Sequence, residues 1–179
     1  MNRLLAAMLA VIAAAVPLGA SAAPGAGPAT AITFEPLGPI YARAFAFEVE
    51  RKVSPGWSLA LQPTLLFASH RVKGEEGALR REDALIGSLT VGARVFLGGD
   101  GLTGFFAGPL VTLALGGFND DRGALPASIA AGGLAGYNHL LGRVFMLSTG
   151  VGAQYHARLD EGRAGRALPL LRLAIGAAF

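Results

Sequence analysis

The feature that most constrains the fold is an alternation with a period of two residues. Between Trp57 and Phe67, the odd positions carry Trp, Leu, Leu, Pro, Leu and Phe, whereas the even positions carry Ser, Ala, Gln, Thr and Leu. Successive side chains of a β-strand point to opposite faces, so this pattern predicts a strand with one large apolar face and one small or polar face. The same alternation recurs in residues 85–96, 105–115, 145–155 and 168–179.

These alternating segments are long for β-strands. They exceed the roughly 5–6 residues of an average strand and reach the roughly 9–11 residues with which a tilted strand crosses a bilayer. Small residues suit the narrow interior of a barrel, and large apolar residues suit contact with lipid. We therefore expect an all-β fold, a transmembrane β-barrel whose apolar face points outward.

The composition agrees with an apolar chain that does not cross a membrane with helices. Hydrophobic residues make up 53% of the sequence and charged residues 15%, and the charged share is well below the quarter that is usual in soluble domains. Past the N-terminal segment, no apolar run approaches the roughly 18 residues of a membrane-spanning helix. The chain has no cysteine, which excludes a disulfide framework and a cysteine zinc site. The net charge of +3 comes without a Lys/Arg run, so no nucleic-acid partner is expected.

Eight strands are expected in an antiparallel up-and-down barrel, because single-chain bacterial barrels have an even number. The first expected strand, Thr30–Leu37, is short, and Pro36 and Pro39 interrupt it; proline belongs at strand edges, starts or bulges. The alternative is one bent strand from Ala31 to Arg51. The other seven expected strands are Tyr41–Arg51, Trp57–His70, Leu85–Phe96, Thr103–Leu115, Ala127–Tyr137, Arg143–His156 and Ala167–Phe179.

The connections between these strands alternate in length. Short turns joined to long polar loops at the opposite end are typical of outer-membrane barrels. The expected short turns are Arg51–Gly56, Leu97–Leu102 and Asn138–Gly142, and the expected long loops are His70–Asp83, Phe118–Pro126 and Ala157–Arg166.

The N-terminus has the pattern of a cleaved secretory signal peptide. Arg3 supplies the positive charge, Leu4–Leu18 is apolar, and Ala20-Ser21-Ala22 fits the small-residue cleavage site. We expect a signal peptide at 1–22, a flexible Gly/Pro-rich lead-in at 23–29 and the barrel at 30–179. The alternative is an uncleaved anchor helix, for which the apolar core is short.

The last expected strand has periodic apolar residues that finish on an aromatic residue. Such a strand resembles the C-terminal signal by which the barrel-assembly machinery recognises outer-membrane barrels. The residues that carry this resemblance are Leu171, Leu173, Ile175 and Phe179.

A second resemblance lies at the start of the expected barrel. Pro36-Leu37-Gly38, Glu48-Val49-Glu50-Arg51, Ser54-Pro55 and Trp57 follow one another as in a set of small, mostly uncharacterised bacterial outer-membrane barrels. By pattern rather than by motif, the mature chain also resembles OmpA/OmpX-like eight-stranded barrels. The resemblance implies an exported protein of the bacterial outer membrane.

Four charged residues fall on the small-residue face, which we expect to line the lumen: Glu48, Glu50, Arg94 and Arg172. On the lipid face each charge would cost roughly 2–4 kcal/mol near the midplane, whereas inside the barrel opposite charges can pair. We expect a structural, salt-bridged plug. The alternative is a binding or conducting site, although an eight-stranded barrel leaves room for little more than side chains.

Catalysis by a small outer-membrane barrel would need a histidine with a serine or acidic partner near the outer rim. His70 follows Ser69, and His156 lies near Asp160 in sequence, but neither pair forms a recognised motif. His139 falls on an expected short turn. Three scattered histidines also make no metal site, so neither a catalytic residue nor a cofactor or metal is assigned.

The expected function is that of a small, monomeric integral outer-membrane barrel with a structural or surface-interaction role. Its expected partners are outer-membrane lipids, lipopolysaccharide phosphates bound by loop Arg and Lys residues, and the barrel-assembly machinery during biogenesis. Two alternatives stay open. One is a lipid-modifying enzyme of the same fold, like a lipid A deacylase or acyltransferase. The other is a soluble lipocalin-like carrier with the two faces reversed.

Overall fold

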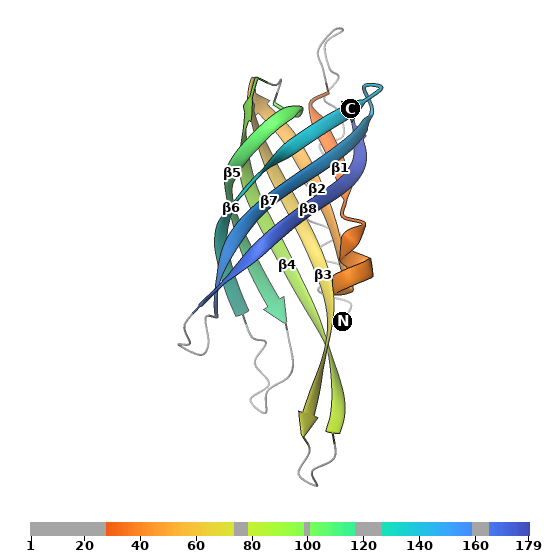
Figure 1. The fold of residues 1–179 in the computed structure, drawn as a ribbon, viewed down its shortest axis with the longest axis vertical. Coiled ribbons are helices and arrows are strands. Elements are labelled where there is room, and N and C mark those ends of the chain that lie inside the picture. Colours follow the sequence, from red (N-terminus) through yellow and green to blue (C-terminus); the bar gives the residue numbers. More distant parts are fainter. Residues whose placement is uncertain (1–27, 74–78, 99–100, 117–126, 159–164) are drawn as a thin grey trace.

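The computed structural model describes residues 28–73, 79–98, 101–116, 127–158 and 165–179. They form a closed antiparallel barrel of eight strands in chain order (Figure 1), which confirms the expected fold class. Residues 1–27, with the expected signal peptide and most of the lead-in, lie outside the described residues. The elements are β1 (Thr30–Phe34), η1 (Gly38–Ala42), β2 (Ala44–Ser54), β3 (Trp57–Lys73), β4 (Leu79–Leu97), β5 (Gly104–Gly116), β6 (Ala127–Leu141), β7 (Phe145–Arg158) and β8 (Arg166–Ala178).

The first strand is separate from the second, so the alternative of one bent strand is wrong. β1 pairs with β2 from Thr30 to Phe34 and then leaves the ladder. The chain turns into η1, a one-turn π-helix that carries Pro39 near its start, because proline cannot donate to a strand ladder. Arg43 then takes a left-handed conformation with φ of 50° and β2 begins. β1 is therefore shorter than the expected Thr30–Leu37.

The large apolar side chains lie on the outside of the barrel, as expected. Trp57, Val111 and Phe179 are 49%, 48% and 60% exposed, whereas the buried side chains include Ser58 and Thr112. The outward position of Val111 and Phe179 is opposite to the inward position that a soluble carrier with reversed faces would require. Within the described residues, no helix is both long and apolar enough to span a bilayer.

Small residues on the inner face allow the strand backbones to approach closely. A Cβ atom added to Gly132 of β6 would lie 2.1 Å from the carbonyl oxygen of Ala153 on β7. On the adjacent Gly133, which faces outward, the nearest atom to an added Cβ would be 3.6 Å away. Steric crowding inside the narrow barrel therefore explains why glycine and alanine occupy the lumen face.

One expected loop is largely strand. The ladder between β3 and β4 continues to the pair Lys73 and Leu79, so most of His70–Asp83 is a hairpin that extends beyond the other strands (Figure 1). The apolar alternation stops there although the backbone ladder continues, so the charged residues of this segment were wrongly assigned to a loop. β6 likewise continues through most of the expected turn, to Leu141. Phe118–Pro126 lies outside the described residues.

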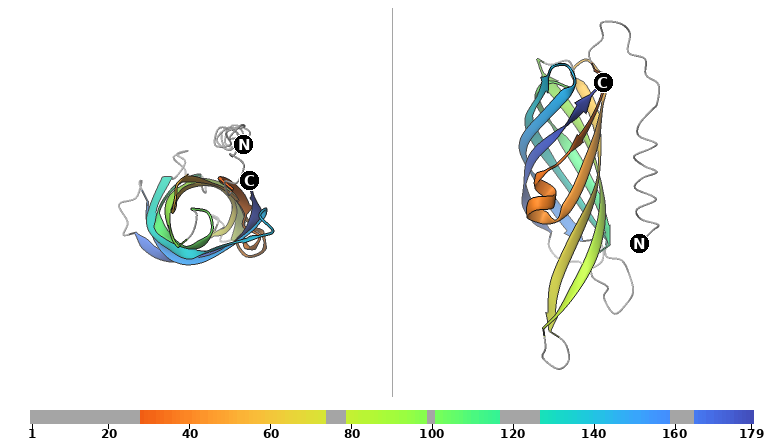
Figure 2. Two further views of the ribbon diagram at one scale, coloured as in Figure 1. Left: turned by 90° about the horizontal axis from the view of Figure 1, so that it is seen from above. Right: turned by 90° about the vertical axis from the view of Figure 1, so that its right-hand side faces the viewer.

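The end of the barrel that holds the short turns is filled with apolar side chains. Leu102, which follows β4, is fully buried with Met146 of β7, Ala31 of β1 and Ala178 of β8. Leu140 packs against this cluster. Seen along its length, the barrel is a closed ring of strands (Figure 2). The cluster seals the lumen at this end, and the polar side chains lie further along it.

Candidate functional site

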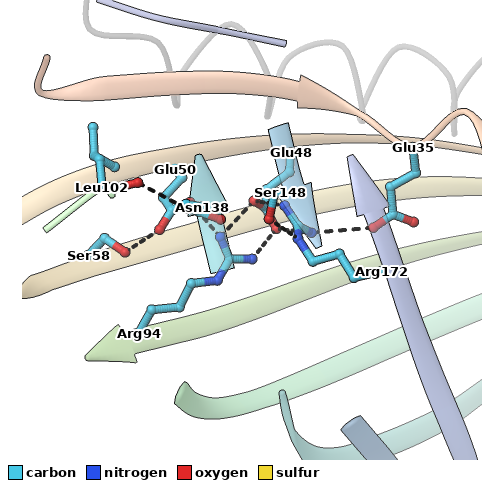
Figure 3. Close-up of polar contacts among 9 residues, drawn as sticks. All are labelled: Glu35, Glu48, Glu50, Ser58, Arg94, Leu102, Asn138, Ser148 and Arg172. Carbon is cyan, nitrogen blue, oxygen red and sulfur yellow. Dashed lines mark hydrogen bonds and ion pairs between the residues drawn. The ribbon is translucent and has the colours of Figure 1, made fainter. Parts of the chain in front are cut away.

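The four charged residues predicted for the lumen come together there. Glu48 and Glu50 reach it from β2, Arg94 from β4 and Arg172 from β8, and each is at most 6% exposed (Figure 3). They meet because their positions share the inward parity of their strands. We call these residues, with Glu35, the lumen network.

Glu48 is the centre of the lumen network, because both guanidinium groups bind it. Arg172 Nη1 donates to Glu48 Oε2 at 2.9 Å and Arg172 Nη2 to Glu48 Oε1 at 2.7 Å. Arg94 Nη1 donates to Glu48 Oε1 at 2.9 Å, and Arg94 Nη2 donates to Glu48 Oε2. Such two-point pairs between guanidinium and carboxylate are among the strongest and most directional polar contacts in proteins.

Glu50 extends the lumen network toward the sealed end. Ser58 Oγ donates to Glu50 Oε1, and Arg94 Nη1 donates to Glu50 Oε2. Asn138 Nδ2 lies 3.3 Å from Glu50 Oε2 and donates to the carbonyl of Leu102 at 3.1 Å. The amide of Asn138 thus connects the charges to the segment that seals the barrel.

Arg172 also binds two residues that the sequence did not indicate as partners. Its Nε donates to Ser148 Oγ at 2.8 Å, and its Nη1 lies 3.3 Å from Glu35 Oε1. Glu35 was expected inside a strand, and it enters the lumen because it keeps the inward parity of Ala31 and Thr33, with its N–H still donating to the carbonyl of Ala46 at 3.1 Å. The inward parity of Ser148 was visible in the alternation, but its partner was not. Asn138 was expected in a turn, so its inward position was missed.

Aromatic and hydroxyl groups complete the lining on either side of the charges. The guanidinium carbon of Arg94 lies 4.9 Å from the ring centroid of Phe106, a cation–π contact. In the other direction, Thr112 Oγ1 lies 2.8 Å from Thr90 Oγ1 and accepts a hydrogen bond from Gln154 Nε2 at 2.8 Å.

Two hollows lie inside the barrel beside this lining. One of about 30 Å³ lies between Glu48 and Arg94, about the volume of one water molecule. A larger one of about 250 Å³ is lined by Glu35, Arg172, Gln154 and His156. It lies on the side of the charges away from the apolar seal.

The three histidines do not build a catalytic centre within the described part of the chain. His156 lines the larger hollow, and no Ser, Asp or Glu side chain among the described residues forms a hydrogen bond or ion pair with it. The His139 ring is stacked near Tyr137, with centroids 6.1 Å apart. The structure does not describe the side chain of His70 or residue Asp160. Among the described residues, no three acidic, His or Cys side chains are grouped as metal ligands would be.

The residues of the expected C-terminal signal all belong to the outward face of the last strand. Leu171, Ile175 and Phe179 are 75%, 37% and 60% exposed, and Leu173 is partly buried. The backbone of Phe179 closes the ring, since its carbonyl accepts hydrogen bonds from Ala29 and Thr30 at 2.9 Å and its N–H donates to Thr30 at 2.8 Å.

Comparison with solved structures identifies a similar barrel. The backbone structure of the outer membrane protein Ail of Yersinia pestis, determined in a phospholipid bilayer nanodisc, matches with a TM-score of 0.53. The two chains are 15% identical over 85% of this chain and 99% of Ail. This chain has the fold of a small outer-membrane barrel. No protein-family model and no curated protein sequence matches it, so the similarity to Ail concerns the fold alone.

Proposed function

We propose that the chain is an integral protein of the bacterial outer membrane, with a packed, ion-paired lumen and a structural or surface-interaction role. The observation that carries this proposal is the inversion of polarity across the barrel wall. Large apolar residues such as Val111 and Leu113 are exposed outside, while Glu48, Arg94 and Arg172 are buried inside. That arrangement is stable in lipid, because charge on the lipid face is costly and apolar side chains there are not.

The filled lumen supports a role other than transport. Between the apolar seal around Leu102 and Met146 and the ion pairs of Glu48, the interior is occupied by side chains. An eight-stranded barrel has little free interior in any case. The parts available to other molecules are thus the outside of the barrel, the end that holds the long β3–β4 hairpin, and the lumen hollow of about 250 Å³ on the side of the charges away from the seal.

Fractionation of the cell envelope tests the location. After expression in a Gram-negative host, we expect the protein in the outer-membrane fraction and a gel mobility that changes on heating, since folded barrels resist detergent. Recovery of the mature chain from the soluble periplasmic fraction would contradict the proposal. Export itself is tested by N-terminal sequencing, for which we expect cleavage after Ala22.

The same proposal includes the barrel-assembly machinery as a transient partner that binds the outward residues of β8. Replacing Phe179 with Ser keeps the backbone hydrogen bonds that close the ring, so we expect unchanged folding in detergent but reduced assembly in cells. The matched control is Phe105→Ser, which removes an aromatic residue of similar exposure from the outer face of β5. Equal assembly of both variants in cells would contradict this part of the proposal.

A further inference from the structure

The barrel wall has an incomplete ladder on one side. β8 pairs with β7 over twelve positions, from Ala177 to Arg166, but with β1 over only four, from Ala178 to Ile175. The segment Arg166–Ala174 therefore has a partner strand on one side only. η1 lies at the side of the barrel beyond the end of β1 (Figures 1 and 2). We call the line between this segment of β8 and η1 the seam.

The two most exposed of the described large apolar side chains lie at the seam. Leu171, at the centre of the unpaired segment, is 75% exposed, and Ile40 of η1 is 70% exposed. For comparison, Val111 on a fully paired strand is 48% exposed. An unpaired strand edge is unfavourable within a hydrocarbon layer, because its backbone groups find no water there. A polar group that reached the seam from the membrane could form hydrogen bonds with these unpaired backbone groups and so reduce the cost.

Two hollows meet at the seam. The lumen hollow of about 250 Å³ is lined by residues of β3 to β8. All of these strand residues face inward except Leu171, which faces outward. A shallow hollow of about 800 Å³ runs over the outer face, with Ala107, Ala135 and Thr149 among its small lining residues. Leu171 and Arg172 line both hollows. An apolar surface outside and a polar space inside thus lie on either side of the same two residues of β8.

The polar space is lined by Glu35 and Arg172 of the lumen network, and the charge of that network indicates what the space accepts. The lumen network holds three carboxylates, Glu35, Glu48 and Glu50, against the two guanidiniums of Arg94 and Arg172. The side chain of Glu35 is the most accessible of the carboxylates, at 24% against 2% for Glu48, and its contact with Arg172 is the longest of the ion pairs, at 3.3 Å. A cationic group placed beside Glu35 would balance the charge, and an anionic one would add to the excess.

We propose that the seam binds a membrane amphiphile with a primary ammonium headgroup. Its apolar chain lies in the outer hollow over Ala135, and its headgroup enters beside Leu171 and donates hydrogen bonds to Glu35. The hydroxyl and amide groups that line the lumen hollow, among them Thr112 and Gln154, accept or donate further bonds to the headgroup. This binding rests on the proposed location in the membrane, which the experiment measures separately.

The test compares two lipids that share acyl chains and differ in headgroup. The full mature chain is folded into micelles of a short-chain phosphatidylcholine with equal amounts of phosphatidylethanolamine and phosphatidylglycerol, and retained lipids are counted by native mass spectrometry. We expect about tenfold more retained phosphatidylethanolamine than phosphatidylglycerol. Glu35→Gln should abolish the preference. Asp83→Asn, which neutralises an acidic residue in the part of β4 that pairs with Ser69, should keep it.

A second pair of variants tests the outer hollow. Ala135→Trp fills it and should reduce lipid retention, whereas Ala153→Trp, on the outer face but outside the hollow, should not. Equal retention of the two lipids, or a preference that survives Glu35→Gln, would overturn the inference. So would competition by free ethanolamine at the concentration of the lipid, because the apolar chain would then contribute nothing. The change of gel mobility on heating, measured in the same samples, tests independently whether the barrel folds in a membrane environment. If that change is absent, the result contradicts the proposed function and not the lipid-binding inference.

Discussion

Arg172 of β8 and Glu48 of β2 form a two-point ion pair, although β1 lies between these two strands in the barrel. Their contacts of 2.9 and 2.7 Å connect the two strands that flank β1, and Arg172 lies just past the point where the β1–β8 ladder ends at Ile175. The ion pair therefore joins the barrel where backbone pairing is missing. We infer that it contributes to closing the ring as well as to filling the lumen.

Removal of one partner should destabilise the barrel strongly. In Arg172→Met, Glu48 keeps its charge with half of its guanidinium contacts, and breaking a buried ion pair in this way typically costs about 3–5 kcal/mol. Urea unfolding in lipid vesicles, followed by the fluorescence of the single tryptophan, Trp57, measures the loss. Arg51→Met, which removes an exposed Arg at the end of β2, should change stability by less than about 0.5 kcal/mol.

The two residues should also be coupled. If Glu48→Gln is combined with Arg172→Met, the total loss should be smaller than the sum of the single losses by about 1 kcal/mol or more, since contacting residues share their interaction. Additive losses would show that the ion pair contributes no joint stability and would contradict its role in closing the ring.

Two adjacent glycines on β6 provide a test of crowding in the lumen. Gly132→Ala would place a methyl group 2.1 Å from the backbone oxygen of Ala153, and such overpacking typically costs about 1–3 kcal/mol. Gly133→Ala points outward and makes only an ordinary van der Waals contact, at 3.6 Å from its nearest neighbour atom, so we expect a change of at most about 0.5 kcal/mol. The same unfolding measurement checks both. Equal stabilities would mean that the strand backbones lie further apart than the structure shows.

The sealed lumen should not conduct ions. In a planar lipid bilayer we expect no channel steps from the protein, because Leu102 and Met146 are fully buried at one end and the lumen network fills the next layer. The double variant Arg94→Ala, Leu102→Gly removes part of both layers and should produce small steps. Salt-dependent steps from the unmodified protein, equal to those of the double variant, would contradict a filled lumen.

The alternation of the sequence was sufficient to predict the barrel and the inward position of the four charged residues. Parity along a strand is a local property, and the cost of charge in lipid decides which face points inward. Glu48 and Arg94 could thus be placed on one surface without knowledge of the register. Their actual contacts could not be predicted, because these depend on the stagger between β2 and β4 that ring closure sets.

Features outside the regular ladders were not predictable in the same way. Leu102 enters the lumen from a segment without alternation, and the contact of Glu35 with Arg172 lies beyond the end of the β1–β8 ladder. The outer half of the β3–β4 hairpin was expected to be a loop, because its charged residues match no apolar face. In each case backbone geometry, rather than side-chain polarity, determines the position, and single-sequence patterns report mainly polarity.

The measurement that tests the membrane barrel most directly compares two arginine substitutions on the outer face. Val111 lies within β5, and Val53 lies near the end of β2 at the turns; they are 48% and 62% exposed. In lipid vesicles, Val111→Arg should lose about 2–4 kcal/mol of folding free energy and Val53→Arg about 0–1 kcal/mol, because the cost of arginine depends on depth in the bilayer. Equal and negligible losses at both positions would show that water surrounds the barrel and would contradict the account.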